Sequence, residues 1–526
     1  MRASDWLGPM GPLVEAIEGY EHRPSQMQMA DAVEDALAHD GVLLVEAGTG
    51  TGKTWAYLAA ALRSGRKVVV STGTKNLQDQ IVERDLPTLL RHLDLRDPPQ
   101  VACMKGLANY LCLRRYDEFR SSADSVAHSA ELGVVERWRE RTRFGDKAEL
   151  PLAEDARIWP RVQSGSDTRI GARCSYYDQC FVTKMRARAE EAQIVVVNHH
   201  LYFADLALRA GAGPIGGAVI PDHDAVIFDE AHRLESVATM FFGSQISSAQ
   251  IERLAKDATR ALRIVKDPSP LPESLRAASD AFFLALPRPP EREGSRAPLD
   301  RSTFTEALEQ RFFKLDDALA ALGAHVKLRA REDESLGQVG RRCGAMRDTL
   351  ARVTEGATGE SVAWTSKRGH GVAIGLSPIR VGGVLEKELF GRDGAIVLTS
   401  ATLTTGGTFD YIKQQVGVDF EVDELTLPSP FDYPRQVGLY IPESLPDPRQ
   451  PSFIEEAAKT TLSLVAITEG GGFVLCTSHR NMHALADACR PTLVDRGHPV
   501  LVQGEAPKLA LLERFREAGH PVLFAT

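Results

Sequence analysis

An eight-residue run, Ala47–Thr54 (AGTGTGKT), has the composition and spacing of a loop that binds phosphate groups. Its glycines let backbone N–H groups turn toward phosphate oxygens without a Cβ in the way. An apolar run precedes it and an apolar helical pattern follows, so the positive end of a helix dipole would face the anion. The residues predicted to bind a nucleoside triphosphate here are Gly48, Thr49, Gly50, Thr51, Gly52, Lys53 and Thr54.

The last two residues of this run supply specific chemistry. The ammonium group of Lys53 would reach the β and γ phosphates, and the hydroxyl of Thr54 would complete the shell of a Mg²⁺ ion. Ala47 stands where the strict pattern has glycine, which leaves these two residues unchanged. A glycine-rich turn that ends in Lys-Thr by chance is the alternative, but the strand and helix around the run favour a phosphate-binding loop.

A second group, Val226–His232 (VIFDEAH), would complete a hydrolytic site. Its apolar residues predict a strand that carries Asp229 to the sheet edge, where the carboxylate can hold Mg²⁺ through water. The neighbouring Glu230 is placed to orient and deprotonate the attacking water. Alone, this group also fits a helix start capped by Asp229. Together with the phosphate-binding loop, the Asp-Glu pair favours hydrolysis over transfer to another acceptor.

Short β-rich runs alternate with helical patterns, an alternation that is typical of parallel α/β units. Ligands of such sheets bind at the carboxyl ends of the strands, where both groups fall. The buried strands expected in the first α/β domain are Val42–Val45, Lys67–Thr72, Ile194–Asn198, Ala225–Asp229 and Ala395–Thr399. A second α/β pattern begins near Leu403, with strands expected at Gly472–Thr477 and Pro521–Ala525.

Two stretches of different character separate these strands. Residues 101–193 contain four of the seven cysteines together with many Arg and Glu residues. Residues 234–375 are predicted to be helical, since apolar residues recur every three or four positions from Phe304 to Leu322. The first α/β domain is therefore expected to carry two insertions.

The composition sets the class of protein. A chain of 526 residues, 43% hydrophobic and 25% charged, is long enough for several globular domains. The net charge of −9 argues against coating nucleic acid through bulk positive charge, but it permits a local basic groove. The sequence has no apolar run suited to a membrane span and no signal-peptide pattern. Seven irregularly spaced cysteines do not suggest a disulfide framework, so a cytoplasmic protein is expected.

The motifs resemble, in their order, those of superfamily 2 DNA helicases of the DinG/YoaA and XPD type. Asp229–His232 resembles the DEAH box, and Val196–Leu201 (VVNHHL) is close to a run typical of the DinG/XPD branch. Singly, Ser/Thr clusters are often only turns and caps; in family order they are specific. The weaker segments are Tyr20–Gln26 (the adenine-reading Gln motif), Ser71–Gln78 (motif Ia), Thr399–Thr402 (motif III) and Val474–Ser478 (motif IV).

The resemblance implies an ATP-driven DNA helicase that moves 5′→3′ on one strand, unwinds duplex DNA and serves repair or replication. Its cofactors would be ATP and Mg²⁺, and its partner single-stranded or forked DNA bound by a monomer. The resemblance adds Arg23 and Gln26 to the ATP-binding residues. The catalytic residues that it implies are Lys53, Asp229, Glu230 and His232, and Ser400 and Thr402 would couple the state of ATP to domain movement. The implied DNA contacts are Thr72, Lys75, Asn198 and His199 in the first motor domain and Ser478, His479 and Arg480 in the second.

The implied fold class is α/β, with two RecA-like P-loop motor domains, the second incomplete, and with an inserted cysteine-bearing domain and a helical arch domain. The expected boundaries are 1–100, 194–233 and 376–404 for motor domain 1, 101–193 for the iron–sulfur-type insertion, 234–375 for the arch and 405–526 for motor domain 2. The family continues into motifs V and VI with their arginine fingers, beyond Thr526. Weak ATP hydrolysis by this chain is therefore expected.

In the family, four cysteines of the insertion hold a [4Fe–4S] cluster. Cys112, Cys174 and Cys180 match three of them, but the remaining position, five residues before Cys174, is Arg169. A guanidinium group carries no acceptor and cannot ligate iron. Three alternatives stay open: a cluster with a different fourth ligand such as Asp167 or water, a residual fold without iron, or recruitment of Cys103.

Two alternatives to the helicase activity also stay open. A DNA-dependent ATPase could translocate or remodel protein–DNA complexes without separating strands, since the motor motifs are shared. A decayed ATP-binding interaction module is the other, although the intact Lys53, Asp229 and Glu230 argue against decay.

Overall fold

The computed structural model describes residues 2–526 apart from 94, 96, 154–155, 166–167, 212–217, 288–295, 300–302, 304, 356–360, 369–370 and 507. Asp167 and Phe304, named above, lie outside the described residues. The chain divides into two compact units, of which the first extends to Phe431 and the second contains Asp432–Thr526. Among the described helices, none is long and apolar enough to cross a membrane.

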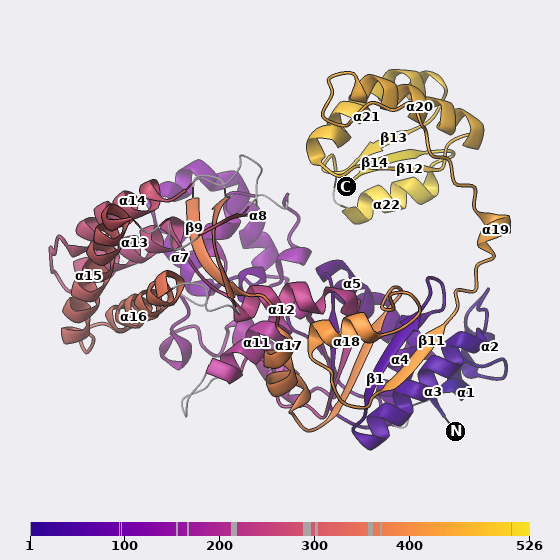
Figure 1. Cartoon of the computed structure of the whole chain (residues 1–526), viewed down its shortest axis with the longest axis horizontal. Helices are drawn as coiled ribbons and strands as arrows, with labels where there is room; N and C mark the ends of the chain where they lie inside the picture. The colour runs from indigo at the N-terminus through magenta and orange to yellow at the C-terminus, as the bar shows by residue number, and fades with distance from the viewer. Residues whose placement is uncertain are drawn as a thin grey trace. The chain divides into compact units, whose positions relative to one another are not determined.

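A seven-stranded parallel sheet forms the centre of the first unit (Figure 1). In spatial order its strands are β11 (Asp423–Leu427), β1 (Val42–Ala47), β10 (Ala395–Ser400), β5 (Ala225–Asp229), β2 (Val68–Thr72), β4 (Ile194–Asn198) and β3 (Val101–Cys103). The five strands predicted for this domain are confirmed, with small differences at their ends. Because all strands are parallel, their carboxyl ends share one edge of the sheet.

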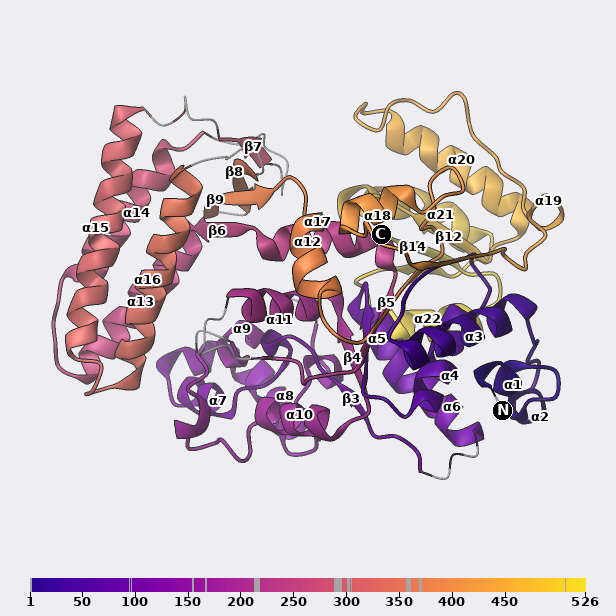
Figure 2. The ribbon, with the colours of Figure 1, turned by 60° about the horizontal axis from the view of Figure 1, so that its bottom comes forward.

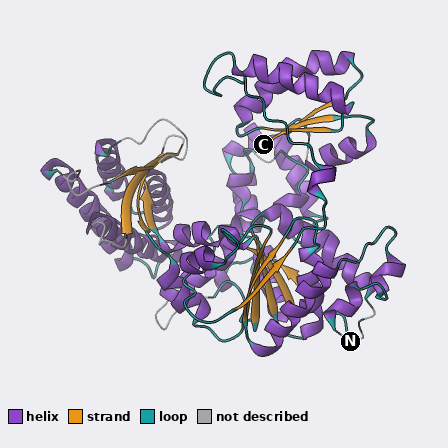
Figure 3. Ribbon diagram, turned by 45° about the vertical axis from the view of Figure 1, so that its right-hand side comes forward, coloured by secondary structure: helices purple, strands orange, loops and turns teal. Residues whose placement is uncertain are grey.

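Both faces of this sheet are buried, because successive side chains of a strand point to opposite sides. In β1, Leu44 packs on one face, whereas Leu43 and Val45 pack on the other. Figure 3 shows helices covering both sides. The helices of this domain are α1 (Ala3–Leu7), α2 (Pro12–Ala16), α3 (Pro24–His39), α4 (Lys53–Ser64), α5 (Lys75–Gln80), η1 (Ile81–Asp85), α6 (Leu86–His92), α11 (His199–Gly211), η6 (Ala231–Arg233), α12 (Leu234–Phe242), α17 (Gly382–Leu385), η8 (Glu386–Phe390) and α18 (Asp410–Val416).

The cysteine-bearing insertion lies between β3 and β4 and consists of short helices around an aromatic core. Tyr116, Trp138 and Trp159 are buried there. The Nζ atom of Lys105 lies 2.5 Å from an Asp79 carboxylate oxygen and 2.6 Å from one of Asp146, which ties the insertion to the motor domain. Its helices are η2 (Leu107–Asn109), α7 (Leu113–Arg120), η3 (Ala123–His128), α8 (Ser129–Arg139), η4 (Lys147–Glu149), α9 (Trp159–Val162), η5 (Gly171–Arg173) and α10 (Phe181–Glu191).

The segment that corresponds to the expected arch contains four long helices packed side by side (Figure 2): α13 (Ser248–Ile264), α14 (Leu271–Ala285), α15 (Glu306–Leu328) and α16 (Glu334–Glu355). The predicted apolar stripe is buried at Leu308, Leu315, Leu319 and Leu322. The prediction that the whole segment is helical is wrong, because it also holds an antiparallel sheet in the order β6 (Ser244–Ser247), β9 (Gly371–Pro378), β8 (Ser361–Arg368) and β7 (Arg296–Pro298). These strands are short or half-buried, so they leave no strong apolar pattern.

The first motor domain extends further than residue 404. Strand β11 pairs with β1 and lies at the sheet edge, and the first unit ends only at Phe431. The prediction that 405–431 belongs to the second motor domain is therefore corrected: the chain returns to the first sheet before it leaves it.

The second unit is a three-stranded parallel sheet in the order β12 (Gly472–Leu475), β14 (Val522–Ala525) and β13 (Val500–Val502). Two of these strands were expected from the sequence. Val502 and Phe524 pack into one core, whereas Leu501 and Leu523 face another, so the sheet is covered on both sides (Figure 1). Its helices are α19 (Tyr433–Gln436), α20 (Phe453–Thr468), α21 (His479–Asp495) and α22 (Lys508–Glu517).

Candidate active site

The glycine-rich run forms a tight loop between β1, which ends at Ala47, and α4, which begins at Lys53. Gly50 and Gly52 have φ angles of +88° and +81°, in the left-handed region that favours glycine. A Cβ on Gly52 would also collide with the amide group of Gln26. The loop thus has the strand–loop–helix context that a phosphate-binding loop requires.

Side chains hold the carbonyl groups of this loop. Lys53 Nζ donates to the carbonyl of Ala47 at 3.1 Å, and Thr51 Oγ1 donates to that of Gly48 at 2.9 Å. The Gln26 amide donates to the carbonyl of Gly52 at 3.0 Å, and the guanidinium group of Arg23 donates to that of Gly50. The N–H groups of Gly48 and Thr51 donate to the carbonyls of Leu427 and Gly48. Those of Thr49, Gly50 and Gly52 are left to point toward an anion.

The Gln26 amide is engaged at both ends in this structure. Its nitrogen donates to the Gly52 carbonyl, and its oxygen accepts a hydrogen bond from the hydroxyl of Tyr20 at 3.2 Å. The side chain is buried, with 4% of the residue exposed. Gln26 therefore acts on the loop itself here, and the adenine contact implied by the resemblance would require these bonds to exchange.

Asp229 ends β5 at the same edge of the sheet. It is 4% exposed and accepts a hydrogen bond from the hydroxyl of Tyr57 at 3.2 Å. Burial, together with the charge of Glu230, raises the pKa of Asp229 to about 6, although the nearby Lys53 opposes the shift. A carboxylate in this environment is poised to bind a cation. Tyr57 was not predicted as a site residue. The only feature of the sequence that could have indicated it is its position one helical turn after Lys53.

Glu230 follows in a left-handed backbone conformation, with φ +59°, which is rare for a residue with a Cβ. One carboxylate oxygen, Oε2, lies 3.3 Å from Nδ1 of His232 and 3.4 Å from Oγ of Ser400. Ser400 Oγ and His232 Nδ1 are 2.8 Å apart. The structure thus brings together three of the predicted residues from two neighbouring strands. Thr402 joins them through its backbone N–H, which donates to Ser400 Oγ at 3.3 Å.

Glu46 is a residue of this edge that the sequence pattern does not single out. It lies in β1, and its carboxylate accepts hydrogen bonds from the backbone N–H groups of Leu403 and Thr404, each at 2.6 Å. The hydroxyl of Thr404 adds a bond at 2.9 Å. The strand that leads into the phosphate-binding loop is therefore tied to the segment that follows Ser400.

The predicted DNA contacts fall into two groups. Lys75 is exposed, with its Nζ 2.7 Å from Asn109 Oδ1, and Ser478, His479 and Arg480 are exposed in the second unit. Thr72 and His199, however, are 0% exposed, so their side chains do not face solvent in this structure, and their contact with DNA stays a prediction.

The side chains of these buried residues form hydrogen bonds within the fold. His199 Nδ1 lies 2.8 Å from Ser71 Oγ, and burial lowers the pKa of His199 to about 3. Asn198, which is 8% exposed, accepts a hydrogen bond from the N–H of Leu201 and so begins α11.

The residues of the cysteine-bearing insertion do not fit a four-thiolate iron–sulfur cluster. In the described part of the chain, no three His, Cys, Asp or Glu side chains converge in a way that could hold a metal ion. Arg169 takes the place of the expected fourth ligand and donates to the hydroxyl of Thr183 at 3.3 Å. Cys103 lies in β3, where burial raises the pKa of its thiol to about 12. A thiol that resists ionisation is a poor metal ligand.

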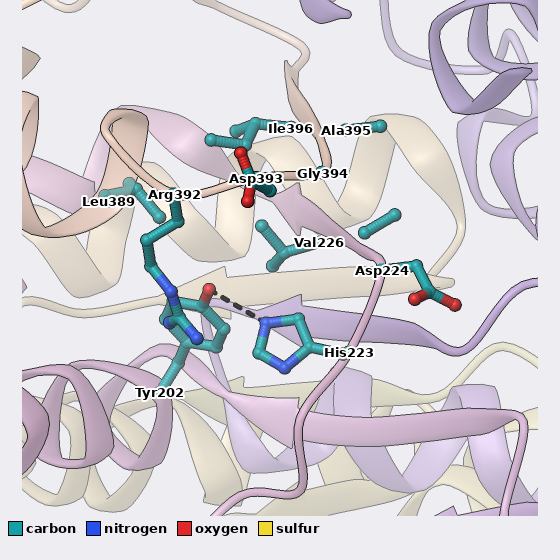
Figure 4. Close-up of a pocket in the computed structure, with 11 residues that line it drawn as sticks. Tyr202, His223, Asp224, Val226, Leu389, Arg392, Asp393, Gly394, Ala395 and Ile396 are labelled. Carbon is teal, nitrogen blue, oxygen red and sulfur yellow. Dashed lines mark hydrogen bonds between the residues drawn. The ribbon is translucent and has the colours of Figure 1, made fainter. Parts of the chain in front are cut away.

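A small cavity lies at the opposite edge of the sheet, where β5 and β10 begin (Figure 4). Its volume is about 20 Å³, and its lining includes Tyr202, His223 and Arg392. The Tyr202 hydroxyl is 3.2 Å from His223 Nε2. This is room for about one water molecule, not for a nucleotide.

Comparison with known proteins agrees with this geometry. Residues 23–96 match the model of the DEAD/DEAH box helicase family, and residues 461–526 match that of the helicase C-terminal domain. The chain is 36% identical over 530 residues to the ATP-dependent DNA helicase YoaA of Escherichia coli strain K12, covering 99% of this chain and 81% of that protein. It is 31% identical over 542 residues to the ATP-dependent helicase DinG of Mycobacterium tuberculosis strain H37Rv, covering 97% and 78%. Among solved structures it is similar to S. tokodaii Xpd4, with a TM-score of 0.51 at 15% identity, covering 96% of this chain and 80% of that one.

A parallel sheet with a phosphate-binding loop after one strand and an Asp-Glu pair after another defines a P-loop nucleotide hydrolase. The two-motor α/β architecture expected from the resemblance is confirmed by these matches. The chain belongs to the YoaA/DinG family of ATP-dependent DNA helicases.

Proposed function

We propose that this chain hydrolyses ATP to move along single-stranded DNA, in the 5′→3′ direction, and to unwind duplex or forked DNA during repair. The observation that carries the proposal is the cluster at one sheet edge, where Glu230, His232 and Ser400 lie within 3.4 Å of one another beside the loop that contains Lys53. Through Ser400, the triphosphate site is connected to β10, the strand that lies between β1 and β5 in the sheet.

In the proposed reaction, the N–H groups of Thr49, Gly50 and Gly52 and the ammonium group of Lys53 bind the phosphates. Mg²⁺, held by Thr54 and Asp229, would neutralise charge on the phosphates. Glu230 orients the attacking water and accepts its proton. His232 and Ser400 contact the Glu230 carboxylate, so a change there on phosphate release would reach β10.

We further propose that the exposed Lys75 contacts the DNA backbone in the first unit, and that Ser478, His479 and Arg480 do so in the second. Such phosphate contacts suit binding that does not depend on sequence. We assign the residues between β3 and β4 to an insertion, and residues 244–378, from β6 to β9, to an arch domain. We assign no iron–sulfur cluster to the insertion, because Arg169 replaces a ligand and the three remaining cysteines do not converge. We also propose that the protein acts as a monomer in the cytoplasm.

The test is strand displacement on a forked DNA with a 5′ single-stranded tail, with matched measurements of ATP binding. Lys53→Ala should abolish both ATP binding and displacement. Arg63→Ala removes an exposed cation near the far end of the same helix, so it is the matched control and should change neither. Hydrolysis stimulated by single-stranded DNA without displacement would instead support a translocase that remodels protein–DNA complexes. ATP binding without any DNA-stimulated hydrolysis would overturn the motor function.

A further inference from the structure

The segment Leu427–Phe431, hereafter the strap, runs from the end of β11 to the end of the first unit. It lies directly on the phosphate-binding loop. The N–H of Gly48 donates to the carbonyl of Leu427 at 3.0 Å, and the hydroxyl of Ser429 donates to the carbonyl of Thr49 at 2.7 Å. No motif recognised in the sequence covers the strap, and the reaction described above does not use it.

Two glycines of the loop, which have no side chain, leave room for the strap. A Cβ on Gly48 would lie 2.7 Å from the backbone nitrogen of Ser429, and a Cβ on Gly50 would lie 2.5 Å from the ring of Phe431. Real Cβ atoms do not approach other atoms so closely. These glycines therefore serve close packing against the strap in addition to the turn itself.

The Ser429 bond completes a pattern in the loop. The carbonyls of Ala47, Gly48, Gly50 and Gly52 are each held by a donor from the loop, from α4, from α3 or from Arg23 just before α3. The carbonyl of Thr49 is held by the strap alone among the bonds found for the described residues. With this carbonyl turned outward, the following N–H is turned inward, which is the orientation that an anion requires.

We propose that Ser429 and Phe431 are positioning residues that hold the phosphate-binding loop in its anion-binding form and link nucleotide binding to the chain junction that follows them. The inference rests on the proposed ATP-dependent function and deepens it. Asp432, the next residue, begins the second unit. A shift of the loop on binding triphosphate is thereby passed to the junction through one hydrogen bond and one aromatic contact.

The first experiment measures the affinity for a non-hydrolysable ATP analogue with Mg²⁺, together with KM and kcat for ATP. Ser429→Ala should raise Kd and KM about fivefold to tenfold, the effect of one lost hydrogen bond, while kcat stays within about twofold because Glu230 and His232 are untouched. Ser429→Thr keeps the hydroxyl and should restore the affinity. Phe431→Ala should weaken binding, and Phe431→Leu should recover part of it. Tyr440→Ala, an exposed aromatic further along the same connection, is the matched control and should have no effect.

The second experiment measures amide hydrogen exchange of the peptide that covers residues 427–440, with and without the analogue. Nucleotide should slow exchange there in the wild-type chain and in Ser429→Thr, but not in Phe431→Ala. The proposal is overturned if Kd is unchanged in Ser429→Ala and Phe431→Ala, if Ser429→Thr is as weak as Ser429→Ala, or if nucleotide protects residues 47–54 and leaves the strap unchanged. In each of those cases, loss of binding in Lys53→Ala would leave the motor function standing.

Discussion

The phosphate-binding loop and the cysteine-bearing insertion both carry family motifs, yet the residues of one converge and those of the other do not. Around the loop, Asp229, Glu230 and Ser400 come from separated parts of the chain to one sheet edge. In the insertion, Cys112, Cys174 and Cys180 are only partly buried and form no ligand group in the described part of the chain.

Other bonds hold the insertion together. Arg115 donates to the carbonyls of Gln163 at 2.6 Å and Pro160 at 3.0 Å, and Arg114 donates to that of Thr168 at 2.8 Å. These guanidinium groups bind the helix that follows Cys112 to the loop that contains Arg169. The comparison teaches that charged donors and an aromatic core are enough to hold the insertion together, whereas the hydrolytic site depends on side chains that converge from separate strands.

The largest effect is expected at the hydrolytic site. Glu230→Gln should lower ATP turnover by about 10²–10⁴-fold, the range of a general base, while ATP binding persists. Turnover and analogue binding are measured in parallel, with Glu235→Gln on the following helix as the control. A variant that hydrolyses ATP at the wild-type rate would remove Glu230 from the mechanism and weaken the contrast between the two regions.

The next effect concerns the guanidinium–carbonyl bonds that hold the insertion together. Arg115→Ala leaves two carbonyls without their charged donor and should lower the free energy of unfolding by about 2–3 kcal/mol. Arg120→Ala removes exposed ion pairs on the same helix and a contact with the Tyr116 ring, 5.8 Å from its centroid, and should cost less than about 1 kcal/mol. Urea unfolding followed by tryptophan fluorescence makes the comparison. Equal effects of the two changes would contradict a special role for the half-buried guanidinium group of Arg115.

A pH-dependent effect is expected from His199. Its pKa is lowered to about 3 by burial, against 6.5 for an ordinary histidine. Below pH 6.5 the unfolded chain takes up a proton that the folded chain refuses, so stability is lost as pH falls from 6.5 toward 3. At pH 5 the loss should reach about 2 kcal/mol at about 1.4 kcal/mol per pH unit.

Unfolding at pH 7.5 and pH 5 measures this loss. His199→Gln should show less of it, whereas His22→Gln, at an exposed position, should behave like the wild-type chain. If His199→Gln and the wild-type chain lose the same stability between these pH values, the buried imidazole is not its source.

The smallest effect is expected from the cysteines. Replacing Cys112, Cys174 and Cys180 together by serine should change the free energy of unfolding by less than about 1 kcal/mol, because all three are only partly buried. Protein purified anaerobically should contain far less than one iron atom per chain before and after the change. Stoichiometric iron and sulfide with visible absorbance, lost in the triple variant, would show that the two regions do not differ in the way proposed.

The strands and the nucleotide loop could be predicted because their signals are local. Each buried strand is a short apolar run, and Lys53 and Asp229 follow such runs directly. Contacts such as Glu46 with Thr404 could not be predicted, because they join residues far apart in the sequence and leave no pattern in either segment. The same holds for Ser429 on the loop.

Exposure could not be predicted from motif order either. A resemblance to a family shows that Thr72 and His199 occupy motif positions in the sequence. Whether their side chains reach solvent depends on how β2 and α11 pack, which the motifs do not show. Strand β11 escaped detection for a related reason: its side chains are largely exposed at the sheet edge, so no apolar run marks it.

The position of β1 in the sheet has a consequence for synthesis of the protein on the ribosome. Both neighbours of β1, namely β10 and β11, are encoded after the insertion and the arch. At about 5–20 residues per second, roughly 350 further residues take about 20–70 s to appear. During that time the strand that carries the nucleotide loop has two unpaired edges, which invite association with other chains. Nascent chains that stall within the arch should therefore depend most on chaperones.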